Sequence, residues 1–439
     1  MKLKRITGLL FYCITCTIAA HAQDTTLLTL KDAVEIALKN NYNIRLSQNN
    51  ATIAGNNVTL GNAGILPVVT GDATSSNSVL TTSQTRADGT SSNIINARNT
   101  GITYGVNLDW TIFDGFAMFA NYDKLKQLDK LGELGLKDTI QATVADVIIT
   151  YYNLISQNDQ IKALNGVLAI SRTQARYAND KFQVGTVSKL EVNTALVNAN
   201  IDTANLIDQQ RLYRSTKIQL NQLLMRDVQT DFVVADTIVV DETLKLGDII
   251  NNAQTQNPAI LAAQINKSLA EINLKQVRAT RYPQLSVTTG YTISDSRNPA
   301  GFARVQNAKG FNYGLTATIN IFDGFNQWRR ERNAKLEIEN AGLNYKQTQQ
   351  NIEATISNFY ISYISGLDLI KLGQNNKNLA KRNLDISLEK YKLGNITPLE
   401  IREAQRNYLD AQSRFSTAQY QSKMAEVTLK QITNTIDIK

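Results

Sequence analysis

The pentapeptide IFDGF at residues 112–116 occurs again, unchanged, at residues 321–325, which is 209 positions later. Farther along the chain the offset is the same, because KFQVGTVSKLEV at 181–192 corresponds to KYKLGNITPLEI at 390–401. Five identical residues could arise by chance, but a shared offset over such a distance indicates an internal duplication of about half the chain.

The duplication also extends upstream of the pentapeptide. There the offset becomes 216, as between Pro67 and Pro283, because the first copy contains a longer loop rich in Ser, Thr and Asn. We therefore predict two structural repeats, 23–232 and 233–439. Each should have the same order of a helix, a strand pair and a long helical hairpin.

The amino terminus has the three parts of a secretory signal peptide. A basic stretch over 2–5 precedes an apolar run over 6–20, and the small-residue pattern Ala-His-Ala follows at 20–22. The run is shorter than the roughly 20 residues that a membrane-spanning helix needs, although a short membrane anchor is the alternative. We predict a signal peptide over 1–22 and an exported mature chain.

Cleavage at this place would leave a mature chain without cysteine or histidine, because Cys13, Cys16 and His21 are the only residues of their kinds. The sequence therefore predicts no disulfide, no metal site and no cofactor, and we do not expect an enzyme. Three of the 46 basic residues are lost against 38 acidic ones, so the net charge falls from +8 to +5. The charge is spread along the chain, so no nucleic-acid partner is expected.

Two segments with period-two alternation occur in each repeat. In YGLTATIN at 313–320 apolar residues alternate with Gly, Thr and Asn, and YGVNLDWT at 104–111 has the same pattern. Such alternation gives a strand one apolar and one polar face. A half-buried strand of a soluble protein has this pattern too, but the strand length and the aromatic residues favour a lipid-facing band and a polar lumen. Strands are predicted at 67–80, 100–113, 283–296 and 309–322.

A sustained heptad pattern follows each pentapeptide. Ile140, Val147 and Leu154 are seven residues apart, and no proline lies between 68 and 257. This pattern predicts long helices that supercoil around one another. A helix over 116–184 would be roughly 100 Å long at ~1.5 Å per residue, which is typical of a rod or a tube.

The repeated pentapeptide is expected to join a strand to a long helix. Asp114 and Asp323 would cap the helix by accepting hydrogen bonds from its first N–H groups. Gly115 and Gly324 would relieve the backbone where the chain changes direction. The joint would occur twice because the chain enters and leaves a membrane twice.

Four strands per chain are too few to span a membrane. An open sheet in lipid leaves unpaired edge groups that cost several kcal/mol each, so membrane sheets close into barrels. Eight strands from a dimer would enclose little more than side chains, whereas twelve strands from a trimer would enclose a water-filled passage. The helices of all three chains would then prolong the passage as a tube.

With these features the sequence resembles the outer-membrane efflux protein family, that of TolC and its relatives. The resemblance rests on the duplicated strand–FDG–helix joint, on LP at 66–67 and YPQLSV at 282–287, and on the pattern G-x-x-x-x-L-E at both helical tips. It implies a mainly α protein with membrane β structure and an internally duplicated TolC-like fold. In that fold a trimeric 12-stranded outer-membrane β-barrel is continuous with a long periplasmic α-helical barrel.

The resemblance also implies a function. A homotrimer in the outer membrane of a Gram-negative bacterium would be the exit duct of an efflux or type I secretion system, surrounded by outer-membrane lipid. It would be a passive channel without catalytic activity. A periplasmic adaptor, or membrane fusion protein, would open it, and an inner-membrane transporter of the RND, ABC or MFS type would drive the transport.

The resemblance further assigns roles to residues at the helical tips. Glu400 and Glu403, three residues apart on one helix face, would form an acidic gate at the periplasmic entrance, with Glu191 in the first repeat. Three copies would bring these carboxylates together, favour cations and raise the pKa of each carboxyl. Ile396 stands where the best-known member of the family has a basic residue that helps to latch the closed state. The residues expected to contact the adaptor are Gly185, Thr186, Val187, Gly394, Asn395 and Ile396.

Two other functions compete with this interpretation. A passive diffusion porin would also be an outer-membrane trimer, but it would not need helical hairpins of some 100 residues. A structural or adhesive coiled-coil envelope protein would leave the alternating strands unexplained. A pair of carboxylates could in principle hydrolyse a glycoside, but the acids here lie on predicted helical surfaces without a pocket signature.

Overall fold

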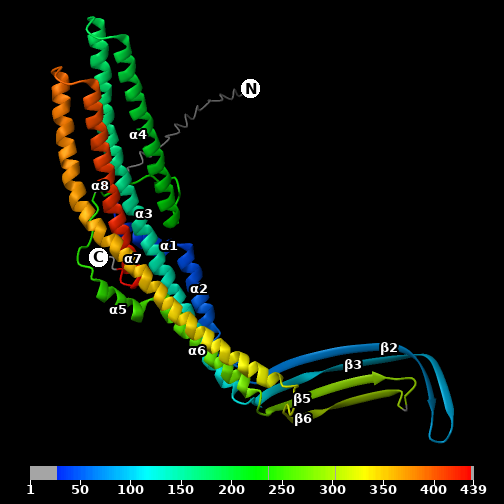
Figure 1. Cartoon of the computed structure of the whole chain (residues 1–439). Coiled ribbons are helices and arrows are strands. Elements are labelled where there is room, and N and C mark those ends of the chain that lie inside the picture. The colour runs from blue at the N-terminus through cyan, green and yellow to red at the C-terminus, as the bar shows by residue number, and fades with distance from the viewer. Residues whose placement is uncertain (1–26, 236, 302, 437–439) are drawn as a thin grey trace, which may run out of the picture.

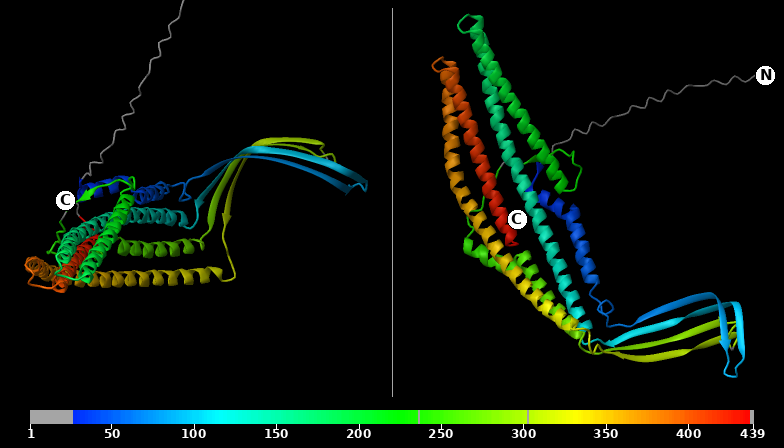
Figure 2. Two further views of the ribbon diagram at one scale, coloured as in Figure 1. Left: turned by 90° about the horizontal axis from the view of Figure 1, so that it is seen from above. Right: turned by 45° about the vertical axis from the view of Figure 1, so that its right-hand side comes forward.

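The computed structural model describes residues 27–235, 237–301 and 303–436 of the 439-residue chain. The predicted signal peptide over 1–22 lies outside the described residues. Two long helical hairpins extend from one end of a four-stranded sheet, and the sheet bends away from the line of the helices (Figures 1 and 2). None of the described helices combines the length and the apolarity that a bilayer span requires.

The sheet is antiparallel throughout and contains both strand pairs in the order β2-β3-β5-β6. The two repeats meet at its centre, where Val106 of β3 pairs with Tyr291 of β5. The outer strands β2 and β6 therefore each keep one unpaired edge among the described residues. The strands are β2 (Val68–Thr85), β3 (Ser91–Phe113), β5 (Gln284–Arg297) and β6 (Val305–Thr318).

The strands of the first repeat are longer than predicted. The sequence suggests a polar loop between 80 and 100, but β2 has 18 residues and β3 has 23. The intervening residues pair with one another, as Thr82 does with Ile94, because Thr and Ile fit an extended backbone well. In the second repeat β6 ends at Thr318 rather than at the predicted 322, since Gln284, its partner, is the first residue of β5.

The two joints between strand and helix have a left-handed backbone, as predicted for their glycines. Gly115 has φ 71° and Gly324 has φ 67°, a region that residues with a Cβ rarely adopt. The following Phe116 and Phe325 also have positive φ and precede the helices directly. Two successive left-handed residues thus turn the chain from the sheet into the helix.

The capping role predicted for Asp114 and Asp323 is wrong. Neither long helix has a side-chain cap, because the residue before each helix is phenylalanine, so the aspartate lies outside the capping position. The Asp323 carboxylate instead accepts a hydrogen bond from Arg330 at 3.1 Å. One carboxylate oxygen of Asp114 is buried without a hydrogen-bond partner among the described residues.

The long helices are confirmed. The first helix of each hairpin has 67 residues, which corresponds to roughly 100 Å at ~1.5 Å per residue, and the second has 35. The two hairpins lie side by side through contacts between α3 and α8. The hairpins are α3 (Ala117–Gln183) with α4 (Lys189–Leu223), and α7 (Asn326–Lys392) with α8 (Pro398–Ile432). The shorter helices are α1 (Leu30–Asn40), α2 (Tyr42–Asn56), α5 (Leu246–Gln256) and α6 (Pro258–Ala279).

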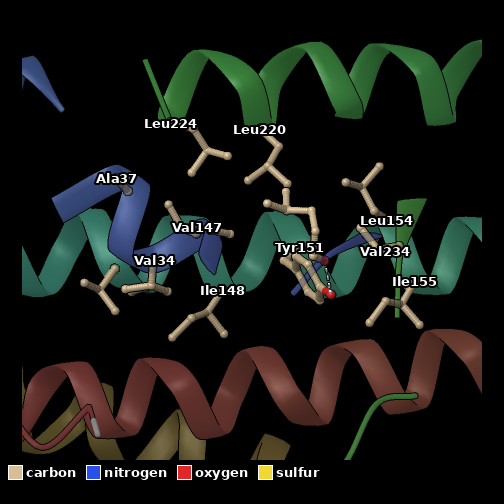
Figure 3. Close-up of a cluster of buried hydrophobic side chains, with 14 of the residues drawn as sticks. Val34, Ala37, Val147, Ile148, Tyr151, Leu154, Ile155, Leu220, Leu224 and Val234 are labelled. Carbon is tan, nitrogen blue, oxygen red and sulfur yellow. Dashed lines mark hydrogen bonds between the residues drawn. The ribbon is translucent and has the colours of Figure 1, made fainter. Parts of the chain in front are cut away.

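The main apolar core lies around the middle of α3. The heptad residues Val147 and Leu154 are fully buried there, as their spacing predicts. They contact the side of α1 that contains Val34 and the end of α4 that contains Leu220 (Figure 3). The heptad stripe of α3 is therefore the surface on which the first repeat assembles.

Two short strands close this core. β1 (Leu27–Leu28) pairs in parallel with β4 (Val233–Val234), which begins the connection between the repeats. The hydroxyl of the buried Tyr151 donates to Leu28 O at 2.8 Å and accepts from Ala235 N at 3.1 Å. Tyr151 thus fixes the start of the described chain and the inter-repeat connection to the same turn of α3.

The inter-repeat connection is fixed a second time, to α8. Asp241 N donates to the Glu426 carboxylate at 2.9 Å, and Lys430 lies between the two acids at 2.9 Å from Asp241 and 2.8 Å from Glu426. Lys423 also binds Glu426, whose side chain is only 3% exposed. The buried carboxylate is thereby neutralised by two lysines, as burial of a charge requires.

Candidate functional site at the helical tips

Both hairpins turn through the same structure. Gly185 and Gly394 have φ 77°, and no atom of the part of the chain that the structure describes lies within 4 Å of the place that a Cβ would take at either glycine, so their role is conformational. The next amide, of Thr186 or Asn395, donates at 2.9 Å to a carbonyl in the last helical turn. This is the usual glycine termination of a helix, and it confirms the predicted turns.

The structure gives Val187 and Ile396 a local role. Each directly precedes the N-cap residue of the next helix and is half-buried although the rest of the turn is exposed. Val192 and Ile401, at the fourth position of those helices, are buried. An apolar residue before the cap commonly packs on this fourth position and sets the angle at which the chain enters the helix. That position suits Ile396 better than a basic side chain.

Glu400 belongs to the cap of α8. Its carboxylate accepts hydrogen bonds from Thr397 N at 2.7 Å and Thr397 Oγ1 at 2.9 Å, and Thr397 Oγ1 accepts from Glu400 N at 3.3 Å. These hydrogen bonds to the charged form hold the pKa of the Glu400 carboxyl below its usual value. In the single chain this direction is opposite to the rise expected for a ring of carboxylates.

The other two acids of the expected gate are placed differently. Glu403 is exposed on the next turn of α8. Glu191 lies in the first turn of α4, on the other hairpin, where its amide donates to the Ser188 hydroxyl at 3.4 Å. Burial raises the pKa of Tyr391, and the charge of Glu191 adds to that rise. The single chain therefore keeps the two glutamates of α8 together and places the third beside α7.

A buried polar cluster, which the sequence did not reveal, joins the hairpins below the tips. Arg402 of α8 donates to both carboxylate oxygens of Asp202 on α4, at 2.9 and 2.7 Å. Ser171 of α3 donates to the same carboxylate at 2.6 Å and accepts from Gln405 at 3.1 Å. The Asp202 side chain is 1% exposed and that of Arg402 18%, so this is an ion pair largely excluded from water.

A signal for this cluster exists in the sequence. Val192, Ala199 and Leu206 form the buried stripe of α4 at steps of seven, and Asp202 stands three residues after Ala199 in the same stripe. An acidic residue in an apolar helical stripe indicates a buried partner of opposite charge. We call Ser171, Asp202, Arg402 and Gln405 the inter-hairpin cluster.

An internally duplicated subunit with a membrane-type sheet at one end and long helical hairpins at the other defines a class of outer-membrane channel proteins. The family model described as "Outer membrane efflux protein" matches residues 33–225 and 249–435, one stretch in each repeat. The chain belongs to this family. It is an outer-membrane protein of Gram-negative type that reaches into the periplasm.

Several characterised proteins are similar in sequence. BepC, an outer membrane efflux protein of Brucella suis, is 21% identical over 91% of this chain and 84% of its own length. TolC of Vibrio cholerae is 18% identical over 76% of this chain and 77% of its own. Protein CyaE of Bordetella pertussis is 24% identical over 58% of this chain, but the match spans only 54% of CyaE.

Solved structures show the same fold. The outer membrane channel CmeC of Campylobacter jejuni has a TM-score of 0.80 at 20% identity, over 92% of this chain and 85% of CmeC. VceC of Vibrio cholerae has a TM-score of 0.74 at 14% identity, over 92% and 96% of the two chains. The TolC-like fold expected from the sequence is thereby confirmed.

Proposed function

We propose that this protein is the outer-membrane exit duct of a tripartite efflux or type I secretion system. Three copies form a passive channel without catalytic activity, which a periplasmic adaptor opens at the helical tips and an inner-membrane transporter of the RND, ABC or MFS type drives. Family membership supports the efflux role. The observation that carries the trimeric duct is the pair of unpaired sheet edges.

The internal repeat indicates how the two unpaired edges, those of β2 and β6, would pair between copies. Within one chain β3 of the first repeat pairs with β5 of the second. By the duplication, β6 is the equivalent of β3 and β2 is the equivalent of β5. The same pairing between β6 of one copy and β2 of the next would satisfy both edges, and three copies would close a barrel of twelve strands.

The two strand–helix joints also differ, because only the joint of the first repeat is closely covered within the chain. A Cβ on Gly115 would lie 2.3 Å from the Ala279 carbonyl oxygen, so α6 packs tightly against this joint. At Gly324, the equivalent glycine, Asn326 Nδ2 is the only atom of the described residues found within 4 Å of that position. With the offset of 216, the equivalent of Ala279 is Ala63. A second copy would therefore place Ala63 against Gly324 and complete the joint.

The helices leave a matching pair of apolar surfaces. Inside the chain α3 packs on α8, so the equivalent contact between copies would join α7 to α4. Each of these helices carries a row of large apolar side chains that are more than 45% exposed in the single chain. These side chains are Leu369, Leu372 and Leu379 on α7, and Leu196 and Ile207 on α4.

The register of the proposed contact is testable with cysteine pairs. The pairing of Val106 with Tyr291, moved by the offsets of 209 and 216, places Leu315 of one copy opposite Ser75 of the next. Paired Cα atoms lie about 4.5–5.5 Å apart, within disulfide reach. We expect Leu315→Cys/Ser75→Cys to form covalent trimers on oxidation. Leu315→Cys/Val79→Cys, four residues out of register, should not. Monomers from both variants would contradict the trimer.

Single-channel conductance tests the duct. In lipid bilayers we expect a small conductance, and an increase when Glu400 and Glu403 are replaced by alanine, because the smaller side chains would widen a narrow entrance. Glu389→Ala, which removes an exposed acid on α7 bonded to Lys392, is the control and should change little. A large conductance that is the same with and without the substitutions at Glu400 and Glu403 would indicate a porin. Absence of conductance, with no need for detergent extraction, would indicate an adhesive envelope protein.

A further inference from the structure

The four strands of the sheet contain three basic residues, and all three occupy one face at one end. They are Arg98 on β3, Arg297 on β5 and Lys309 on β6, and all are exposed. Thr100 pairs with Arg297 and is two residues from Arg98, so these three share a face. Lys309 pairs with Ile293 on that same face. We call Arg98, Arg297 and Lys309 the basic strip.

The rest of this face is the apolar one. Its rows run across the strands, from Trp110, Val287 and Leu315 near the helices to Tyr104 and Ile293 near the strip. Ile112 and Ile102 bound this apolar stretch on β3, a length of roughly 33 Å at ~3.3 Å per residue. Tilted by about 40°, it would form a band of about 25 Å, the height typical of outer-membrane barrels.

Arg98 and Arg297 lie just beyond the edge of this band that is far from the helices, where both hairpin loops of the sheet are found (Figure 1). Lys309 lies inside the band, in the row of Tyr104 and Ile293. One acid, Asp295, shares the face, and the amide of Asn307 stands opposite it. Asp72 and Asp109 belong to the other face. Among the described residues the three basic side chains form no ion pair or hydrogen bond, so their charge is not neutralised within the chain.

Cations at the rim of an apolar band suit one kind of ligand. Long basic side chains lay their aliphatic stems along apolar surface and extend their charged ends to the interface. Arginine binds phosphate oxygens through two parallel hydrogen bonds, and neighbouring rows place Arg98 and Arg297 about 8 Å apart. A ligand with phosphate groups and acyl chains would meet the strip and the band at the same time.

We propose that the basic strip binds the phosphate groups of a phosphorylated glycolipid in the outer leaflet of the outer membrane. The proposal rests on the proposed function, since it needs this face to be the lipid-facing side of a barrel with the helices in the periplasm. Arg98 and Arg297 hold one phosphate. Lys309, two rows nearer the helices than Arg297, extends its charged end from inside the apolar band toward the same headgroup. Tyr104, Tyr291 and Phe311, which lie farther into the band, contact the acyl chains.

Native mass spectrometry of the purified full-length protein with lipid A tests this assignment. We expect Arg98→Gln/Arg297→Gln/Lys309→Gln to reduce lipid A binding at least tenfold, and dephosphorylated lipid A to bind weakly to the unaltered protein. Arg86→Gln/Arg382→Gln/Lys335→Gln is the matched control. It removes the same charge from the β2–β3 hairpin loop and from exposed positions of α7, and it should bind lipid A normally.

Other results would overturn the proposal. These are equal binding by both triple variants, equal binding of dephosphorylated lipid A, or displacement of lipid A by inorganic phosphate alone at equimolar concentration. Conductance of the same preparations separates this proposal from the function. A basic-strip variant that conducts normally and also binds lipid A normally contradicts only the lipid site, whereas a wild-type protein that does not conduct contradicts the duct.

Discussion

Glu400 has two possible tasks at the tip, and its geometry restricts one of them. As a capping residue it holds its carboxylate against Thr397 and remains charged to a lower pH than a free glutamate. A role as a gate residue that bound passing cations would compete with both of these hydrogen bonds for the carboxylate. Glu403 makes no such contact and is exposed. We therefore expect Glu403 to respond more to cations at the entrance than Glu400.

The first prediction concerns this cap. Thr397→Ala removes the hydroxyl that accepts from Glu400 N and should cost about 1 kcal/mol of local helix stability. Hydrogen exchange at the first turn of α8 should become faster, while exchange in the middle of α8 stays unchanged. Thr428→Ala, in the interior of the same helix, is the control. Unchanged exchange at the tip would show that the capping box does not hold α8.

At the scale of single residues, the sequence predicts backbone conformation better than it predicts the hydrogen-bond partners of side chains. Gly185 and Gly115 have the left-handed backbone that their surroundings in the sequence suggest. Asp114 does not cap, because Phe116 also takes a positive φ and moves the start of the helix beyond its reach. That second left-handed residue could not be predicted, since phenylalanine rarely adopts this conformation.

At the scale of elements, the inter-hairpin cluster governs how the hairpins of one subunit are held together. Separating α4 from α8 at this level would leave the Asp202 carboxylate buried without a cation. Ser171 of α3 would keep its bond to that carboxylate within the first hairpin but would lose the hydrogen bond that Gln405 of α8 donates to it. The two hairpins are therefore expected to move as one body at this level, and any independent movement is confined to the turns beyond it.

The second prediction tests this ion pair. Asp202→Asn should lower the free energy of unfolding by about 3 kcal/mol, because Arg402 loses its partner in a largely buried place. Asp202→Leu/Arg402→Met should recover much of the loss. Asp208→Asn breaks an exposed pair with Arg211 on the same helix and should cost about 1 kcal/mol or less. If Asp202→Asn and Asp208→Asn lowered the thermal unfolding temperature equally, the inter-hairpin cluster would not be a major source of stability.

The elements themselves follow from the sequence to differing degrees. The heptads of α3 and α7 predict their length well, since a repeated apolar stripe leaves a helix few alternatives. The outer halves of β2 and β3 are missed, because Ser, Thr and Asn suit loops as well as paired edges. Whether such a segment pairs depends on the neighbouring strand and not on its own composition.

At the scale of the whole molecule, the connection between the repeats gives stability a dependence on pH. Hydrogen bonds from Thr243, and then from Lys430, hold the pKa of the Asp241 carboxyl well below its usual range. A depressed pKa in the folded state adds stability above the unfolded value of about 4, and this stability is lost as pH falls toward the folded pKa.

The third prediction follows from that sign. At pH 7 Asp241→Asn should lower the free energy of unfolding by about 1 kcal/mol or less, since the side chain is one-third exposed and water screens it. The difference from the unaltered protein should shrink as the pH is lowered through 4, as thermal unfolding would show. Asp385→Asn, which affects an exposed pair on α7, is the control. A difference that grows on acidification would refute the assignment.

The fourth prediction separates folding from assembly. Alanine at Gly115 would strain the backbone and meet the Ala279 carbonyl within the same chain, so Gly115→Ala should reduce the amount of folded subunit. Gly324→Ala has the same backbone strain but meets nothing closer than Asn326 Nδ2 at 3.8 Å within the chain, so its additional defect should appear as a lower yield of trimer from folded subunits. Gel filtration in detergent measures both. If the ratio of trimer to folded subunit were the same for Gly115→Ala and Gly324→Ala, there would be no evidence that another copy covers Gly324.

The short pairing of β1 with β4 has a consequence for the order of events during export. Leu27 and Leu28 leave the export machinery first, yet their partners Val233 and Val234 follow some two hundred residues later. Until then, Tyr151 has neither of the backbone groups that its hydroxyl joins. We therefore expect the core of the first half to remain incomplete until the start of the second half has been exported, and a newly exported chain to be cleaved most readily by proteases during that interval.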